Sequence, residues 1–105
     1  MTSDPIPDIS IVIPLYNEEA NVRQLCLRLF ETLANLQETW EVVCVDDGSS
    51  DRTMELLKEE QAARQGMTIV ALARNFGQHA AIMAGFAQSH GQWVITLDAD
   101  LQNLP

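Results

Sequence analysis

The sequence predicts an α/β fold in which a Rossmann-like parallel sheet has helices on both faces. Four short apolar runs, rich in β-branched residues, alternate with three segments of helical periodicity along the 105 residues. Strands that alternate with helices in this way pair in parallel through right-handed crossovers. The apolar content of 47% argues against disorder, and the length fits one domain or less. We expect the third, second, first and fourth strands to lie side by side.

The first strand is expected over Ile9–Pro14, a β-branched run that ends at a proline. Residues 1–8, which precede it, are polar and are expected to be flexible. An amphipathic helix is expected over Glu18–Leu36, with Asn17 as its N-cap and acids in its first turn. Its apolar residues share one face at three- and four-residue spacing. They are Val22, Leu25, Cys26, Leu29, Phe30, Leu33 and Leu36.

The second strand is expected over Trp40–Val45, and residues 46–51 form a turn rich in capping residues. The second helix is expected from about Arg52 to Gln65, with Gly66 as its C′ residue. The third helix contains small residues that permit close packing. The remaining expected elements are a strand over Thr68–Ala73, a helix over Gly77–Ser89 and a strand over Trp93–Leu97.

The composition limits the classes of partner. Proteins that bind duplex nucleic acid carry a basic face, whereas this chain has 15 acidic and 6 basic residues and a net charge of −9. No stretch is long and apolar enough to span a bilayer, and the N-terminus lacks a signal-peptide pattern, so a cytoplasmic location is expected. Cys26 and Cys44 fit neither a disulfide framework nor a metal motif.

Acidic residues follow three of the four predicted strands. In a parallel sheet all strands end at the same edge, and ligands bind there. Like charges gathered at one edge repel, so a bound cation or donor-rich ligand groups are expected to offset the cost. The acids are Glu18 and Glu19, then Asp46, Asp47 and Asp51, then Asp98 and Asp100, while Arg74 follows the third strand.

Asp98 and Asp100 stand one residue apart directly after the fourth strand. A divalent cation held by such carboxylates would bridge them to a phosphate-bearing ligand. Taken alone, however, Asp-x-Asp is common by chance, and residues 46–51 are also explained by a turn and a helix cap. The functional interpretation depends on the convergence of these groups at one edge of the sheet.

Other small α/β classes fit less well. A phosphoacceptor signalling domain should carry its acid pair directly after the first strand and a lysine after a later strand, and no lysine stands at a later strand end here. The sequence contains no G-x-G-x-x-G dinucleotide-binding motif and no G-x-x-x-x-G-K-[ST] phosphate-binding loop.

Three stretches together resemble the family 2 inverting glycosyltransferases with the GT-A fold. They are residues 10–19 (SIVIPLYNEE), 45–53 (VDDGSSDRT) and 98–102 (DADLQ). Residues 74–85 (RNFGQHAAIMAG) are most similar to the polyprenyl-phosphate sugar transferases of that family. This group includes dolichol-phosphate mannose synthase and undecaprenyl-phosphate glycosyltransferases. The resemblance extends over nearly everything from Ile9 onward.

The resemblance implies a role for each edge residue. Pro14, Tyr16 and Glu18 would hold the nucleoside, with Tyr16 against the base and Glu18 accepting from ribose hydroxyls. Asp47 would accept from the uracil N3–H, and Asp46 would shape the pocket. The resemblance further places Arg74 near the base or the diphosphate, and has Asp98, Asp100 and Gln102 hold Mg²⁺ or Mn²⁺ on the diphosphate of the donor.

The resemblance also implies that residues 9–105 are the nucleotide-sugar-binding part of a longer glycosyltransferase domain, truncated at the C-terminal end, that is, the N-terminal half of a GT-A fold. The expected reaction transfers a sugar from a nucleotide-sugar donor, UDP-linked, to a polyprenyl phosphate or another glycan or lipid acceptor at the cytoplasmic face of the membrane. The alternative is a non-catalytic nucleotide-sugar-binding module. The catalytic base is expected outside this chain, which alone should be inactive. Its exposed sheet edge is expected to cause either weak stability or self-association into homo-oligomers that cover the edge.

Overall fold

The computed structural model describes residues 6–100, which form a parallel sheet between two layers of helices. Strands and helices alternate strictly along the chain, as the sequence pattern predicts. The elements are β1 (Ile9–Leu15), α1 (Val22–Leu33), β2 (Trp40–Asp46), α2 (Thr53–Ala63), β3 (Met67–Ala71), α3 (Gln78–Gln88) and β4 (Trp93–Thr96). Within the described residues, no helix combines the length and apolar character needed to cross a bilayer.

The sheet has the predicted order β3-β2-β1-β4, and every pairing is parallel. β1 is central and pairs with β2 along its whole length, from Ile9 opposite Trp40 to Leu15 opposite Asp46. Its ladder with β4 is shorter and runs only from Ile9 opposite Trp93 to Val12 opposite Thr96. In the order β3-β2-β1-β4 the winding direction of the chain changes between β1 and β4. The carboxyl ends of strands at such a point leave room for a ligand.

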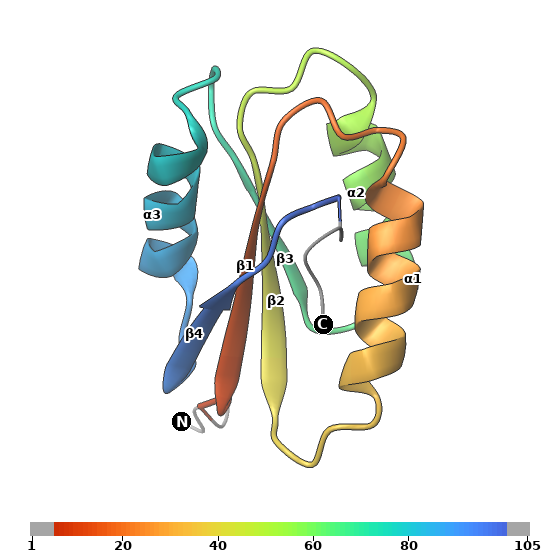
Figure 1. Ribbon diagram of the computed structural model, residues 1–105, viewed down its shortest axis with the longest axis vertical. Helices are drawn as coiled ribbons and strands as arrows, with labels where there is room; N and C mark the ends of the chain where they lie inside the picture. The colour runs from red at the N-terminus through yellow and green to blue at the C-terminus, as the bar shows by residue number, and fades with distance from the viewer. Residues whose placement is uncertain (1–5, 101–105) are drawn as a thin grey trace.

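The helices cover both faces of the sheet, which confirms the expected fold class. Figure 1 shows α1 and α2 on one side of the sheet and α3 on the other. Alternate residues of each buried strand point to opposite faces, so Ile11 and Ile13 pack toward α1 and α2, while Val12 packs toward α3. On the second face α3 packs closely, because a Cβ at Gly85 would lie 2.4 Å from Val12 Cγ1.

The first helix starts later than the sequence predicts. It begins at Val22 with Asn21 as N-cap and has no acid in its first turn. Asn17 is instead a loop residue with a left-handed φ of 53°. The backbone N–H groups of Glu18 and Glu19 donate to Thr53 Oγ1 and Asp51 Oδ2. These contacts with the next loop hold the segment outside the helix.

The chain is anchored just before β1. Asp8 accepts a hydrogen bond from the Thr39 backbone N–H at 3.0 Å and donates one to the Thr39 carbonyl at 3.1 Å. Its own carbonyl accepts from the backbone N–H of Trp93 at 3.0 Å. Of the expected flexible segment 1–8, residues 1–5 lie outside the described part of the chain, and Asp8 is bound to the start of both neighbouring strands.

Candidate functional site

A pocket of about 430 Å³ opens at the carboxyl edge of the sheet, within the size range of about 300–1,000 Å³ usual for small-molecule sites. It lies between the ends of β1 and β4, and loops from four different elements contribute to it. We call it the edge pocket. Its lining residues are Pro14, Leu15, Tyr16, Glu18, Asp47, Asn75, Gln78, Asp98, Ala99 and Asp100.

The β1–α1 loop supplies Pro14, Tyr16 and Glu18 to this pocket, as the sequence predicts. Tyr16 is 47% exposed, so a face of its ring is open to a ligand. The Glu18 carboxylate accepts a hydrogen bond from Asn21 Nδ2 at 2.8 Å, which fixes its side chain beside the pocket.

The β1–α1 loop is held by the β2–α2 loop through contacts on both sides of Asn17. The Asn17 backbone N–H donates to Ser49 Oγ at 2.9 Å, and its Oδ1 accepts from the Ser50 N–H at 2.8 Å. Because these contacts join two loops, the position of Tyr16 depends on residues 49–50 as well as on β1.

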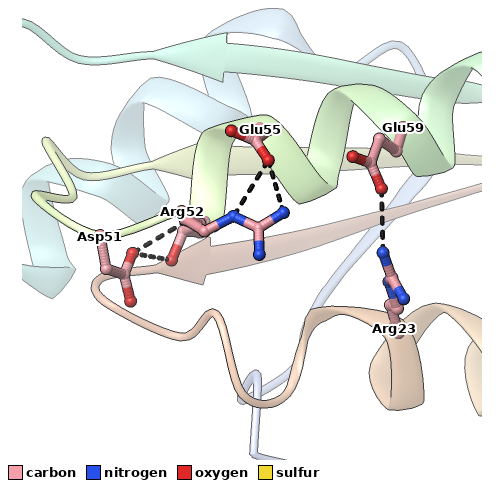
Figure 2. Close-up of polar contacts among 6 residues, drawn as sticks. Arg23, Asp51, Arg52, Glu55 and Glu59 are labelled. Atoms are coloured by element: carbon pink, nitrogen blue, oxygen red, sulfur yellow. Dashed lines mark hydrogen bonds and ion pairs between the residues drawn. The ribbon is translucent and has the colours of Figure 1, made fainter.

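Asp51 and Thr53 complete this connection at the start of α2. Figure 2 shows Asp51 there, together with the Arg52–Glu55 pair and the Arg23–Glu59 pair between α1 and α2. Burial raises the pKa of Asp51, but hydrogen bonds from the Thr53 hydroxyl, the Thr53 N–H and the Glu19 N–H outweigh it and hold the pKa below its ordinary value. Asp51 therefore stays ionised as a structural acceptor.

Asp47 lies in the wall of the pocket and is 2% exposed. Its carboxylate accepts from the Phe76 N–H at 2.8 Å, the Gly77 N–H at 3.0 Å and Asn75 Nδ2 at 3.0 Å. Gly77 is the N-cap of α3, so a carboxylate from the end of β2 stabilises the positive end of this helix. A carboxylate has about four acceptor positions, so Asp47 can accept one further hydrogen bond from a ligand.

The structure does not bring two of the expected nucleotide-binding residues into the pocket lining. Asp46 is 5% exposed and accepts from the Ser49 N–H at 3.3 Å, so it shapes the turn after β2. The guanidinium of Arg74 lies over the ring of Phe76, 4.6 Å from its centroid. Arg74 is held there by a cation–π contact, outside the pocket wall.

Asp98 and Asp100 both line the pocket on the β4 side. Ala99 between them is 4% exposed and packs into the core on the α1 side, and this anchors the segment. The two carboxylates are hard oxygen ligands of the type that Mg²⁺ and Mn²⁺ prefer. Gln102, the third expected ligand, lies outside the described residues, and residues 6–100 contain no group of three acidic, His or Cys side chains that could hold a metal.

Asn75 and Gln78 line the pocket but have no role predicted from the sequence alone. Both follow β3, where the sequence pattern singles out only Arg74. The signal that could have found them is the polar pair that flanks Phe76-Gly77 at the start of a helix. Because the loop with Asn75 and the first residue of α3, Gln78, lie at the same sheet edge as the acids, both residues line the same pocket.

The fold and the pocket define a parallel α/β domain with an acidic pocket at the carboxyl edge of its sheet. The family model for glycosyl transferase family 2 matches residues 10–105. The chain therefore belongs to glycosyl transferase family 2.

Curated relatives point to one branch of this family. The chain is 55% identical over 103 residues to the undecaprenyl-phosphate 4-deoxy-4-formamido-L-arabinose transferase of Pseudomonas paraeruginosa, and 52% identical over 103 residues to the protein of the same name from Pectobacterium carotovorum. These matches cover 96% and 97% of this chain. The chain spans 30% and 32% of the length of these relatives.

Solved structures agree on the fold. TarS from S. aureus in complex with UDP-GlcNAc matches with a TM-score of 0.73 and 26% identity, over 89% of this chain and 26% of TarS. The mannosyltransferase PcManGT from Pyrobaculum calidifontis, in complex with GDP-Man and Mn²⁺, matches with a TM-score of 0.74 and 23% identity, over 90% of this chain and 28% of that one.

Proposed function

We propose that this chain is the donor-binding part of a glycosyltransferase that transfers a sugar from a UDP-linked donor to a polyprenyl phosphate. The observation that carries the proposal is the edge pocket, in which an exposed aromatic ring and four carboxylates from three loops surround one cavity. The similarity to undecaprenyl-phosphate sugar transferases and to a UDP-GlcNAc-bound structure supports the choice of substrate class.

In this proposal the nucleoside occupies the side of the pocket formed by β1 and β2. Tyr16 stacks on the base, with Pro14 beneath it, and Glu18 accepts from ribose hydroxyls. Asp47 accepts from the uracil N3–H with its remaining acceptor position. Asp46 contributes through the turn that it forms with Ser49.

Arg74 has a conditional role in the proposal. Its guanidinium is stacked on Phe76, and it would have to leave this ring to reach a diphosphate. An exposed cation–π contact of about 0.5–1 kcal/mol is weak enough for this movement. We therefore place Arg74 among the nucleotide-binding residues as a group that moves when the donor binds.

The diphosphate would occupy the β4 side, where Asp98 and Asp100 would hold Mg²⁺ or Mn²⁺, with Gln102 as a further ligand. A bound cation would stabilise the nucleoside diphosphate as it leaves the sugar. The donor set fits such a cation, because an anionic diphosphate beside two carboxylates requires a positive charge between them. The Mn²⁺ bound to PcManGT supports this assignment.

The acceptor side is assigned from the relatives alone. Their names specify undecaprenyl phosphate, a lipid acceptor, so we place the reaction at the cytoplasmic face of a membrane. Every carboxylate of the edge pocket has a donor-side role in this proposal. The base that orients the acceptor is therefore assigned to a part of the relatives that this chain does not span.

Calorimetric titration of the chain with UDP, GDP and ADP, with and without Mn²⁺, tests the proposal. We expect UDP to bind most tightly, with Mn²⁺ strengthening its binding. Asp47→Ala should remove the preference for uracil and also release the N–H groups of Phe76 and Gly77 that its carboxylate holds, whereas Glu31→Ala, an exposed acid of α1, should change nothing. Equal affinity for UDP and ADP in the unmodified protein would refute the base assignment.

A further inference from the structure

The three helices that cover the sheet present different side chains to the solvent. Those exposed on α1 and α2 include Arg23, Arg28, Glu31, Glu55, Lys58 and Glu59. α3 contains no Asp, Glu, Lys or Arg. We call its exposed residues on the side away from the sheet the outer face of α3, and they are His79, Ala80, Met83, Phe86 and Ala87. A helix that covers a sheet in water normally keeps charged residues on this side.

The sizes of the side chains on α3 are also the reverse of what exposure to water favours. Its buried residues are the small Ala81 and Gly85, whereas Met83 is 51% exposed and Phe86 is 40% exposed. These two large side chains are three positions apart and so are neighbours on one face of the helix. Phe76, just before the helix, is also 51% exposed. Covering such a patch with an apolar phase lowers the free energy.

The charges of the chain are segregated in the same sense. Residues 61–97, which include β3, α3 and β4, contain no acidic residue, although the chain has 15. Figure 1 shows α3 on one side of the sheet, opposite α1 and α2. Glu41 pairs with Ser10 on the α3 side, but its carboxylate is bonded to Ser10 and His90. Because the net charge is −9, an anionic surface repels the α3 side less than the side formed by α1 and α2.

We propose that the outer face of α3, together with Phe76, lies on the surface of a phospholipid bilayer. This inference rests on the proposed function, in which the acceptor is a polyprenyl phosphate held in a bilayer. α3 begins at Gln78, which lines the edge pocket, so a bilayer against α3 lies beside that pocket. In the chain without donor, the guanidinium of Arg74 over the Phe76 ring adds a positive charge for lipid phosphates.

The length of α3 determines how it meets the bilayer. Its 11 residues extend over about 16 Å, whereas the hydrocarbon core of a bilayer is about 30 Å thick. α3 therefore lies along the surface, with Met83 and Phe86 among the lipid chains near the headgroups.

Co-sedimentation with vesicles of phosphatidylcholine and phosphatidylglycerol, without any polyprenyl phosphate, tests the inference. The unmodified chain should bind. Met83→Glu should bind at least about tenfold more weakly, because a carboxylate replaces an apolar side chain that lipid covers, whereas Met83→Leu should bind as before. Leu27→Glu is the matched control, since Leu27 is 53% exposed on α1, and it should bind like the unmodified chain. Circular dichroism verifies that each variant is folded.

Two results would overturn the inference. One is an unmodified chain that does not bind the vesicles, and the other is an equal effect of Met83→Glu and Leu27→Glu on vesicle binding. If the unmodified chain also self-associates without vesicles and Met83→Glu abolishes this, the outer face of α3 contacts a second copy instead. UDP titration of the same samples tests the proposed function separately. Binding of UDP without binding of vesicles would refute this inference alone, whereas binding of vesicles without UDP would refute the proposed function.

Discussion

Gly48 lies directly against the backbone of Arg74. A Cβ built on Gly48 would be 2.2 Å from the Arg74 carbonyl carbon, and Gly48 itself has a left-handed φ of 68°. The turn after β2 and the loop after β3 are therefore in backbone contact at the carboxyl edge. Together with the hydrogen bonds that Asp47 accepts, this contact makes the two loops one wall of the edge pocket.

Gly48→Ala should destabilise the protein by more than about 2 kcal/mol, because the cost of the left-handed conformation adds to the cost of the collision with the Arg74 backbone. Gly77→Ala is the matched control. Gly77 also has a positive φ, of 103°, but a Cβ there would meet nothing within 4 Å, so only the conformational cost of about 1–3 kcal/mol is expected. Urea unfolding gives the loss in free energy of unfolding for each variant. Equal losses for the two variants would show that Gly48 is not in tight contact with Arg74.

Asp100→Ala should abolish most of the Mn²⁺ dependence of UDP binding, because one of the two carboxylates proposed to hold the cation is lost. UDP affinity without metal should change little. Glu19→Ala serves as the control, since Glu19 is an exposed acid at the same edge but does not line the pocket. Calorimetry with and without Mn²⁺ gives the comparison, and full metal dependence in Asp100→Ala would rule out this cation site.

Glu41 joins the starts of β1 and β2 to the segment before β4. Its Oε2 accepts from Ser10 Oγ at 2.5 Å and from the His90 backbone N–H at 2.6 Å. Burial raises the pKa of Glu41, but the hydrogen bonds from Ser10 and His90 and the charge of His90 outweigh it and hold the pKa below its ordinary value of 4.5. The ionised form is therefore the one that stabilises the fold.

Because the folded-state pKa is depressed, the stability from Glu41 is present above pH 4.5 and is lost as the pH falls below it. Glu41→Gln should cost about 1 kcal/mol near neutral pH, since the charge-assisted bonds become neutral ones. The difference from the unmodified protein should shrink as the pH falls below 4.5. Denaturant unfolding across this range measures it, with the exposed Glu38→Gln as control. A constant difference at all pH values would contradict the linkage.

The edge strand β4 should mediate self-association. Within residues 6–100 it pairs with β1 alone, and it carries no charged residue to discourage pairing with another chain. Trp93 is 71% exposed and Ile95 is 45% exposed. Trp93→Lys should weaken self-association in sedimentation experiments, whereas Leu27→Lys, at a position 53% exposed on α1, should not. A monomer at all concentrations before mutation would contradict this expectation.

The sheet order could be predicted from the sequence because four apolar runs and three crossover helices leave few topologies. The residue at which α1 begins could not be predicted from the sequence. Asn17 and Glu18 look like a cap and a first helical turn, but their backbone N–H groups donate to Ser49 and Thr53, which lie 32 and 35 positions further along the chain. A local sequence pattern does not reveal side-chain acceptors that hold this segment from such a distance along the chain.

The pocket lining shows the same division between local and distant effects. Residues that directly follow β1 and β4, such as Tyr16 and Asp98, line the pocket as predicted. Arg74 does not, because a neighbouring aromatic ring holds its guanidinium. Asn75 lines the pocket instead, and its Nδ2 donates a hydrogen bond to the carboxylate of Asp47, which follows β2. The hydrogen bond between Asp47 and Asn75 spans 28 positions, so a local sequence pattern does not reveal it.

The 105-residue chain should bind the donor without transferring its sugar. An inverting displacement needs a base within hydrogen-bond reach of the acceptor. Asp98 and Asp100 are assigned to the cation, Glu18 is held by Asn21, and Asp47 already accepts three hydrogen bonds. Release of UDP from a UDP-sugar should therefore be the same with and without a polyprenyl phosphate. Release that requires the acceptor, and that disappears in Asp100→Ala, would show that the chain contains a complete catalytic site.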